Sequence, residues 1–292
     1  LTFLGRCFLQ INLREFKLSE TRHGLMTYPS NDGAIGKCLE KFGEWSEGEN
    51  IIMSNFISEG DTIIDVGANI GTTVLPASKK VGQNGKVIAF EPQSIVGQCL
   101  QTNLTLNDIK NVVVYNIALS NKDGWAKLND NEFTESGRYG EAGISENGTD
   151  IKTMKLDDLK LNSCSLIKLD IEGHEWEALK GGNAFLSEYR PVVYMEAKND
   201  LKSTEECLKW LMENNWKCYW HYAFWYRNDN FKKNKDTAIL SNVGVGVGDM
   251  NLLAIPEEEK QPNYLPEITN YKEKWNQDNY LSFFEENNIE II

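Results

Sequence analysis

Residues 62–93 constrain the fold more than any other stretch, because they hold two apolar strands, a glycine-rich turn and an acidic residue within one β–α–β unit. A β-branched run over 63–66 is broken by glycines within 67–71, residues 72–80 favour a helix, and residues 86–90 form a second predicted strand. In such a unit the turn lies at the carboxyl end of the first strand, where glycines let backbone amides approach a ligand. The stretch therefore predicts an α/β fold with a ligand site at this edge.

An acidic residue, Glu91, follows the second strand, and in dinucleotide-binding folds an acid at this place accepts hydrogen bonds from ribose hydroxyls. The turn reads D-x-G-x-N-x-G from Asp65, with Asn69 where the dinucleotide fingerprint G-x-G-x-x-G requires a glycine. The pattern therefore predicts a ligand with ribose and carboxylate groups, and it argues against a nicotinamide dinucleotide.

The composition disfavours two classes of partner. The 292 residues include 43 acidic and 30 basic side chains, and the net charge of −13 argues against nucleic acid or an anionic membrane surface. No apolar run of about 18 residues is present to span a bilayer. The six cysteines show no C-x-x-C pair and no zinc-ligand spacing, so we expect reduced core thiols in a cytoplasmic protein.

The segments around the central unit read as additions to one domain. Residues 1–48 are a lead-in that we expect to cover the ligand cleft, residues 49–256 are the main domain, and residues 257–292 are an acidic extension that docks through aromatic side chains. Between the first two parts, Ser46 is expected to cap an amphipathic helix that ends near Gly60.

The chain after the central unit continues the alternation of helix and strand. Residues 94–106 form a predicted helix, and residues 112–118 a third strand whose end carries Asn116 and Ala118. Asn116 either contacts the ligand's base or simply ends the strand. A hairpin with arms at 125–128 and 151–154 encloses the polar stretch 129–150, which is a candidate substrate lid because loops of that length are commonly functional.

A second chemical cluster lies in LIKLDIEGHEWEALKGG, where a strand over 165–171 delivers several ionisable groups to the ligand edge. They are Lys168, Asp170, Glu172, His174 and Glu175. The next strand, 191–197, ends at another acid, Glu196. Asp170, Glu172 and Glu196 converge, and such a group either removes a proton or holds Mg²⁺. Glu175 has the simpler explanation of a favourable charge at a helix N-terminus.

A strand over 216–225 is rich in aromatic residues, which either stack on a sugar or fill the core. His221 within it is a structural or a catalytic histidine. The glycine series at 244, 246 and 248 precedes a strand rather than a helix, so we reject it as a nucleotide fingerprint.

The motifs DVGANIG, FEP, LDDL and KLDIEGHEWEALKGG, in this order, resemble the FkbM family of class I S-adenosylmethionine (SAM) methyltransferases. The resemblance implies a Rossmann-like α/β fold with a seven-stranded, mostly parallel sheet, the last strand antiparallel, and helices on both faces. It implies methyl transfer to a hydroxyl oxygen, often on a saccharide. The positions matched to SAM binding are Asp65, Gly67, Ala68, Asn69, Gly71, Glu91, Pro92, Asn116, Ala118 and Asp170. The candidate catalytic residues are Asp170, Glu172, His174 and Glu196, and no metal is expected.

The expected reaction is an in-line displacement in which the protein aligns an acceptor oxygen and removes its proton. The expected partner is a small-molecule or glycan acceptor, with no nucleic acid and no membrane span, and homodimerisation is left open. Two alternatives remain at this point. They are a nicotinamide-dependent oxidoreductase on a similar fold, and a glycan-binding protein without turnover.

Overall fold

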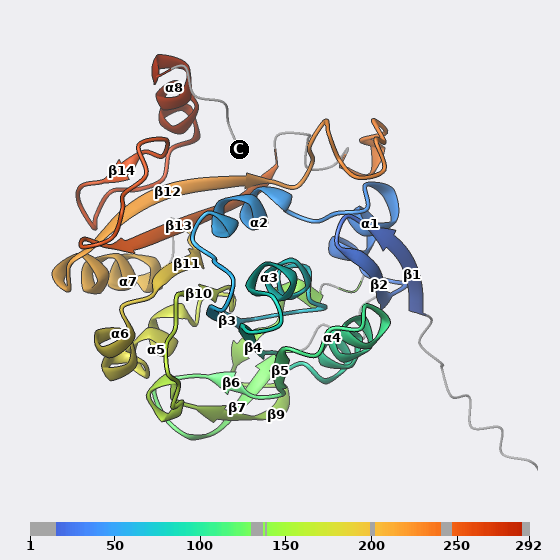
Figure 1. Ribbon diagram of the computed structural model, residues 1–292, viewed down its shortest axis with the longest axis horizontal. Helices are drawn as coiled ribbons and strands as arrows, with labels where there is room; N and C mark the ends of the chain where they lie inside the picture. Colours follow the sequence, from blue (N-terminus) through green and yellow to red (C-terminus); the bar gives the residue numbers. More distant parts are fainter. Residues whose placement is uncertain (1–15, 130–136, 138, 199–201, 241–246, 288–292) are drawn as a thin grey trace, which may run out of the picture.

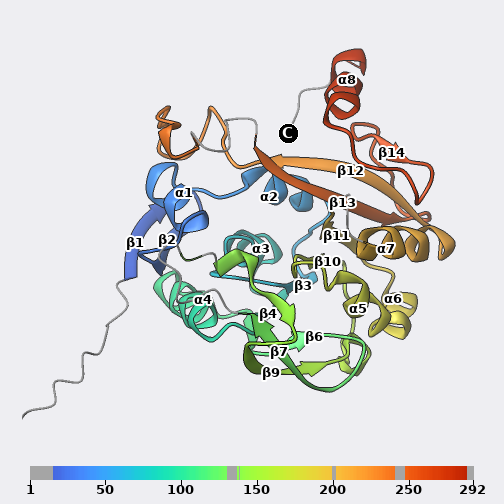
Figure 2. The ribbon, with the colours of Figure 1, turned by 180° about the vertical axis from the view of Figure 1, so that it is seen from behind.

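An eight-stranded sheet forms the centre of the molecule, with helices on both faces (Figure 1, Figure 2). The computed structural model describes residues 16–129, 137, 139–198, 202–240 and 247–287. The strands of the main sheet are β3 (Thr62–Val66), β4 (Lys86–Phe90), β5 (Val112–Tyr115), β10 (Leu166–Leu169), β11 (Val192–Glu196), β12 (Trp216–Phe224), β13 (Gly248–Pro256) and β14 (Glu267–Ile268). The predicted α/β class is confirmed, and the two-residue strand β14 adds an eighth strand to the seven expected.

The strand order is β14-β12-β13-β11-β10-β3-β4-β5. Strands β5, β4, β3, β10 and β11 pair in parallel, whereas β13 is antiparallel to both of its neighbours. The chain enters this sheet at β3, moves outward to β5 and then returns to β10 on the other side of β3. The carboxyl ends of β3 and β10 therefore meet at a topological switch point, where ligands bind in open α/β sheets.

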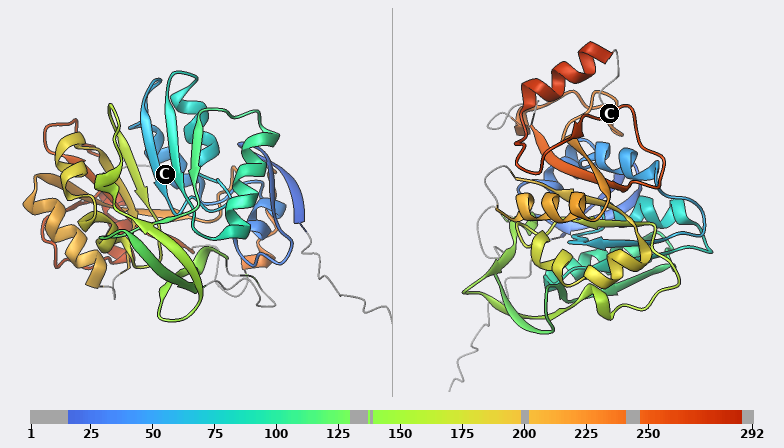
Figure 3. Two further views of the ribbon diagram at one scale, coloured as in Figure 1. Left: turned by 90° about the horizontal axis from the view of Figure 1, so that it is seen from below. Right: turned by 90° about the vertical axis from the view of Figure 1, so that its left-hand side faces the viewer.

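Two groups of helices cover the sheet. The first comprises α2 (Glu47–Ser54), α3 (Val74–Val81) and α4 (Ser94–Leu106), and the second α5 (Glu175–Lys180), α6 (Asn183–Tyr189) and α7 (Lys202–Glu213). Right-handed crossovers place the groups on opposite faces, because the chain moves away from the switch point in opposite directions. Helix α5 contacts α6 and α7, and α2 contacts α3 (Figure 3). Short 3-10 helices are η1 (Tyr139–Glu141), η2 (Leu156–Asp158) and η3 (Ala238–Leu240).

A second sheet, of order β6-β9-β7-β8, lies beside the main one. It consists of β6 (Ala118–Leu119), β7 (Gly124–Asn129), β8 (Gly143–Ser145) and β9 (Thr149–Met154). The predicted hairpin is present as the antiparallel pair β7 and β9. The predicted single strand over 112–118 is wrong, because β5 ends at Tyr115 and β6 belongs to the second sheet. Asn116 lies at the break, and its Nδ2 donates to the carbonyl oxygen of Glu91 (3.2 Å), which ties the chain to the end of β4.

The N-terminal segment forms a hairpin of β1 (Phe16–Thr21) and β2 (Gly24–Pro29), followed by α1 (Ile35–Lys41). One of its links to the main domain is Asn103, a fully buried residue of α4. The Asn103 side chain accepts from the Thr27 amide (2.6 Å) and donates to the carbonyl oxygens of Thr27 (3.1 Å) and Ile70 (2.9 Å). One buried amide thus fixes the hairpin to the turn that follows β3.

The helix expected after Ser46 is shorter than predicted and lacks the expected cap. Helix α2 ends at Ser54 rather than near Gly60. Ser46 lies in the left-handed region (φ 44°), and its hydroxyl donates to the Glu49 carboxylate (2.9 Å) instead of accepting a helix amide. The first turn is therefore held by a contact between side chains.

The aromatic side chains of β12 fill the core. Trp216, Tyr219, Trp220 and Tyr222 are buried, so they do not form a sugar platform. Tyr222 stacks on Trp275 of the C-terminal extension, with ring centroids 5.4 Å apart.

The C-terminal extension contains α8 (Gln277–Asn287), whose Tyr280 and Phe284 are each 2% exposed. The extension therefore packs on its own domain.

Five cysteines lie in the described residues, and all are buried and free: Cys38, Cys99, Cys164, Cys207 and Cys218. Cys7 lies outside the described residues. Over the ranges that the structure describes, we find no helix with the length and apolar character needed to cross a membrane.

Candidate active site

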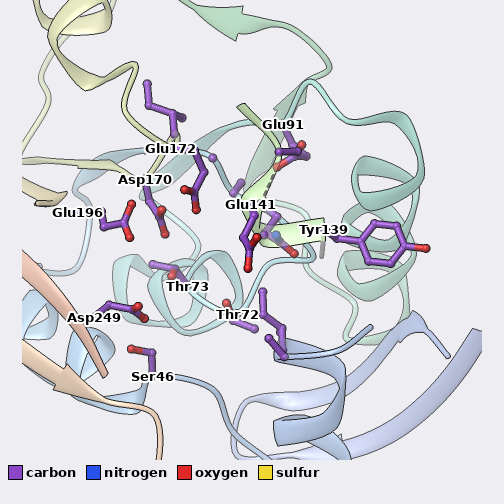
Figure 4. Close-up of a pocket in the computed structure, with 18 of the residues that line it drawn as sticks. Ser46, Thr72, Thr73, Glu91, Tyr139, Glu141, Asp170, Glu172, Glu196 and Asp249 are labelled. Atoms are coloured by element: carbon purple, nitrogen blue, oxygen red, sulfur yellow. Dashed lines mark hydrogen bonds between the residues drawn. The ribbon is translucent and has the colours of Figure 1, made fainter. Parts of the chain in front are cut away.

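A cavity of about 920 Å³ opens at the carboxyl ends of the parallel strands. The turn after β3, the end of β4, the segment after β10 and the end of β11 supply one part of its wall, and the N-terminal segment and β13 supply another (Figure 4). Ligand-binding cavities commonly measure about 300–1,000 Å³. The cavity therefore has room for the expected nucleoside ligand and part of an acceptor.

The turn after β3 packs directly onto the end of β10. Gly67 has φ 83°, and a Cβ atom there would lie 1.9 Å from the carbonyl oxygen of Asp170. Any side chain at this position would push the two strand ends apart. Gly67 thus brings the two sequence motifs together at the cavity.

Glu91 holds this turn from the end of β4. Its Oε2 accepts the Asn69 amide (2.9 Å), and its Oε1 accepts the Gln93 amide (2.8 Å). Burial raises the pKa of Glu91 to about 7, against the opposite effect of these two amides. Each carboxylate oxygen retains a second lone pair, so one side chain is able both to clamp the turn and to accept from ribose hydroxyls.

Gln93 adds an acceptor that the protein leaves unsatisfied. The residue is 2% exposed and lines the cavity, and its Oε1 has no hydrogen-bond partner among the described residues. Buried polar atoms in native structures are normally paired. A ligand with an N–H donor, such as a nucleobase amino group, fits this requirement.

Lys168 and Asp170 form a salt bridge at the end of β10. Their Nζ and Oδ2 atoms lie 2.9 Å apart, and the Asp170 side chain is 38% exposed whereas that of Lys168 is 6% exposed. Burial alone would lower the pKa of Lys168, but the charges of Asp170, Asp65 and Glu49 outweigh it and raise the pKa. The cavity therefore contains an accessible carboxylate fixed by a buried ammonium group.

Glu172 and Glu196 share a second lysine. Lys198 Nζ lies 2.7 Å from Glu172 Oε2 and 3.1 Å from Glu196 Oε2. Burial raises the pKa of Glu196, and the neighbouring charges of Asp170 and Glu172 raise it further. Glu172 has φ 54°, and left-handed backbone in a residue other than glycine is often found at functional sites.

His174 lines the cavity beside these acids, and its Nε2 lies 3.0 Å from the Ser120 hydroxyl. Burial lowers the pKa of His174, so the neutral imidazole is favoured. Glu175 accepts the amides of Ile171 (3.2 Å) and Gly173 (3.1 Å) through Oε1. It thereby fixes the turn that carries Glu172 and His174.

The oxygens of Asp170, Glu172 and Glu196 lie within 4.8 Å of one another, a spacing that a divalent cation would require. The two lysines already bond to all three carboxylates. Positive charge at this cluster is therefore supplied by the protein itself.

Most of the predicted site residues line the cavity. They are Gly67, Ala68, Asn69, Glu91, Pro92, Ala118, Asp170, Glu172, His174 and Glu196. Three predicted SAM-binding residues lie behind its wall. Asp65 is 2% exposed, Gly71 packs against Leu100 of α4, and Asn116 holds the Glu91 carbonyl from outside the cavity.

His221 lies away from the cavity in the core of β12. It is fully buried, and its Nδ1 is 2.7 Å from the Tyr194 hydroxyl. Burial lowers its pKa to about 3. These contacts assign it a structural role.

The candidate lid is described in part. Residues 130–136 and 138 lie outside the described residues. Those from 139 to 144, which include η1, line the cavity.

The sequence-based prediction gave no site role to several residues of the cavity wall, among them Trp45, Gln93, Lys198 and Asp249. Trp225 also lines the cavity, and it belongs to the aromatic stretch 216–225 that was expected either to stack on a sugar or to fill the core. Lys198 follows Glu196 closely, and a lysine just beyond an acid at a strand end is a usable signal. Asp249 is the second residue of β13, and because this strand is antiparallel its start reaches the same edge as the end of the neighbouring strand β11. No local pattern marks that reversal.

The model of the FkbM methyltransferase domain matches residues 65–219. This chain belongs to the FkbM methyltransferase family. The family match includes the turn after β3, Glu91, the cluster after β10 and Glu196.

One curated relative is the hexuronic acid methyltransferase AglP of Haloferax volcanii, 30% identical over 155 residues, which are 51% of this chain and 62% of the relative. The chain thus matches less than two thirds of that relative's length. Among solved structures, an FkbM methyltransferase from Methylobacillus flagellatus is 18% identical with TM-score 0.46, over 68% of this chain and 44% of that one. A SAM-dependent O-methyltransferase from Thermotoga maritima is 17% identical with TM-score 0.41, over 84% and 79%.

From the buried acids Glu49 and Asp249 of the cavity wall, we expect the free energy of unfolding to fall as pH rises. Burial raises the pKa of Glu49 to about 8 and that of Asp249 to about 7, from 4.5 and 3.8. A raised pKa in the folded state gives stability that is complete below the ordinary value and lost as pH rises through the folded value. We expect the melting temperature without ligand to fall by at least about 4 °C between about pH 5 and about pH 8.

Differential scanning fluorimetry across this range measures the effect. Asp249→Asn should flatten the profile, whereas Asp108→Asn, at a side chain 85% exposed, should leave it unchanged. A profile of the unaltered protein that is flat or rises with pH would contradict the assignment.

Proposed function

We propose that this protein is a SAM-dependent O-methyltransferase that methylates a hydroxyl group of a saccharide. The observation that carries the proposal is one cavity with two chemically different sides. The Glu91 clamp and the unsatisfied oxygen of Gln93 lie on one side, and the Asp170 carboxylate held by Lys168 lies on the other. Membership of the FkbM family supports methyl transfer over nicotinamide-dependent oxidation. The relative AglP, named for a sugar acid, supports a saccharide acceptor.

The residues on the nucleoside side fit SAM. The turn formed by Gly67, Ala68 and Asn69 presents backbone to the cavity, Glu91 supplies acceptors for the ribose hydroxyls, and Gln93 offers an acceptor for the adenine amino group. When bound, SAM supplies an electrophilic methyl group and leaves as its demethylated sulfide.

Asp170 is the base in this proposal. Its side chain is accessible from the cavity, and the ammonium group of Lys168 holds the carboxylate in place through a contact of 2.9 Å to Oδ2. Asp170 takes the proton of the acceptor hydroxyl, because a neutral alcohol attacks weakly. A positioned base contributes about 10²- to 10⁴-fold, and alignment of the acceptor by the wall supplies much of the remaining rate.

Glu172, His174 and Glu196 orient the acceptor in this scheme. Lys198 fixes the two carboxylates, and Ser120 fixes the imidazole. The two lysines take the place of a divalent cation, so activity in excess EDTA should match activity without it. The five buried free cysteines support the reducing cytoplasm as the location.

The proposal is tested by mass spectrometry after incubation with SAM and a panel of sugars and glycolipids, with addition of one methylene per transfer as the readout. Isothermal titration with SAM, its demethylated product and NAD⁺ accompanies it. Binding of SAM without methylation of any saccharide would favour a non-catalytic protein or another acceptor class. Binding of NAD⁺ alone would favour the oxidoreductase.

Glu91→Ala should lower SAM affinity at least tenfold, because the substitution removes acceptors for the ribose hydroxyls. Charge-assisted hydrogen bonds are each worth roughly 1.5–3 kcal/mol. The same change frees the amides of Asn69 and Gln93, so the ligand-free melting temperature should also fall. Titration calorimetry and thermal unfolding measure the two effects.

Glu91→Gln separates the effects, because its amide retains one acceptor oxygen and the shape of the side chain. We expect its SAM affinity and its ligand-free melting temperature to lie between those of the parent and of Glu91→Ala. Unchanged SAM affinity in a folded Glu91→Ala variant would exclude the ribose role.

Asp170→Asn should lower the rate of methyl transfer by about 10²-fold or more, because shape and hydrogen-bonding capacity remain while the base is lost. SAM affinity should change much less, since the predicted ribose contact is on β4. Single-turnover rates and titration calorimetry measure these quantities. The control is Asp158→Asn, at a carboxylate 43% exposed that pairs with Lys155 away from the cavity. A parent-like rate for Asp170→Asn would move the base to Glu196.

A further inference from the structure

Given the proposed function, the charged residues on the acceptor side of the cavity indicate which class of acceptor binds there. Of the residues that line the cavity, eight carry carboxylates and three are lysines. Figure 4 shows Asp170, Glu196 and Asp249 on one side, away from Glu91. The acceptor therefore binds against a wall that is strongly acidic.

Two of the three lysines of this wall already bond to carboxylates, whereas Lys37 acts through its charge on Asp32. Lys168 bonds to Asp170, and Lys198 bonds to Glu172 and Glu196. No salt bridge between described residues involves Glu49 or Asp249. Their hydrogen bonds come from neutral groups, the Ser46 hydroxyl (2.9 Å) and Trp225 Nε1 (2.6 Å). Two carboxylates on the wall thus lack a bonded counter-charge.

Two tryptophans lie next to these carboxylates. Trp45 and Trp225 both line the cavity, and their ring centroids are 5.0 Å apart. Trp225 is the donor to Asp249 and is therefore adjacent to it. Aromatic faces attract cations, tryptophan most strongly, and they also cover the apolar face of a sugar ring. Carboxylates beside two tryptophans are a suitable environment for an ammonium group on a sugar.

The burial of these acids also favours a positively charged ligand. Desolvation raises the pKa of both Glu49 and Asp249. Asp170 and Asp249 raise the pKa of Glu49 further, Asp170 and Glu172 raise that of Asp249, and Lys168 acts against these effects in both cases. Elsewhere on the wall, Asp32 is 4% exposed and its Oδ2 has no hydrogen-bond partner among the described residues. A bound cation would relieve this accumulation of negative charge, whereas a bound carboxylate would increase it.

We infer that the acceptor is a saccharide that carries a protonated amino group and no carboxylate, with the ammonium group bound between Asp249, Glu49 and the faces of Trp45 and Trp225. The inference rests on the proposed function and names the substrate class of the same site. It separates this chain from a methyltransferase of hexuronic acids. All four residues lie outside residues 65–219, which the family model matches, so family membership does not dictate the acceptor.

The test compares acceptors that share one ring and differ in charge: methyl glycosides of glucose, glucosamine and glucuronic acid, with the galactose series as a second set. The measured quantity is kcat/KM for methyl transfer at saturating SAM and pH 7. We expect glucosamine-type acceptors to exceed neutral ones by about 10- to 100-fold, the range of one or two charge-assisted contacts, and uronates to be the poorest.

Asp249→Asn retains size and an acceptor for Trp225, and it should reduce the preference of the amino sugar over the neutral sugar to within about threefold, an estimate for losing one charged contact. Asp108→Asn should leave the preference intact. SAM affinity by titration calorimetry should be equal in all three proteins, which shows that the variants are folded.

A preference for the uronate or the neutral sugar would overturn the inference while leaving saccharide methylation intact. A preference for the amino sugar that survives Asp249→Asn unchanged would overturn the assigned position of the ammonium group. Methylation of none of these saccharides would instead refute the proposed saccharide function, and the inference with it.

Discussion

The buried ammonium group of Lys168 is the interaction on which the catalytic edge depends. Lys168 is 5% exposed, and an uncompensated charge at such a position costs several kcal/mol. Compensation comes from the Asp170 carboxylate at 2.9 Å and from the charges of Asp65 and Glu49. These acids belong to β3, to α2 and to the segment after β10. One lysine therefore ties the central strands, the N-terminal helix and the accessible carboxylate into a single electrostatic unit.

The parts of the fold that were predictable from sequence are those set by local pattern. Strand β4 and helix α4 begin and end at the predicted residues, because apolar periodicity and turn residues mark both. The predicted strand over 112–118 failed because a tertiary contact, from Asn116 to the carbonyl of Glu91, breaks it. The acceptor wall was missed for a related reason. Asp249 reaches the cavity only because β13 reverses direction, and this pairing is invisible in its own sequence.

The site contains features that cost folding free energy. Glu91 and Asp249 are held in surroundings where burial raises the pKa of each to about 7. The desolvation of these carboxylates costs folding free energy, and proteins often retain such costs at functional sites. The turn at Gly67 is a further constraint on the site. Its positive φ and its close approach to the Asp170 carbonyl oxygen leave no room for a side chain. Pre-organisation of the cavity before ligands arrive explains why these features persist.

Under the proposed function, the division between the matched and unmatched parts of the chain separates the residues assigned to the reaction from those assigned to the acceptor. Residues 65–219 contain the turn, Glu91, Asp170 and Glu196, to which the proposed function assigns the binding of the nucleoside and the transfer of the proton. The segment before β3 and the strand β13 close the cavity from outside that range and supply Trp45, Glu49 and Asp249, and Trp225 follows directly after β12. A change of charge in these two segments leaves the strand ends at the switch point untouched. Under this proposal, the charge of the acceptor is therefore free to vary while the residues assigned to SAM binding and proton transfer stay the same.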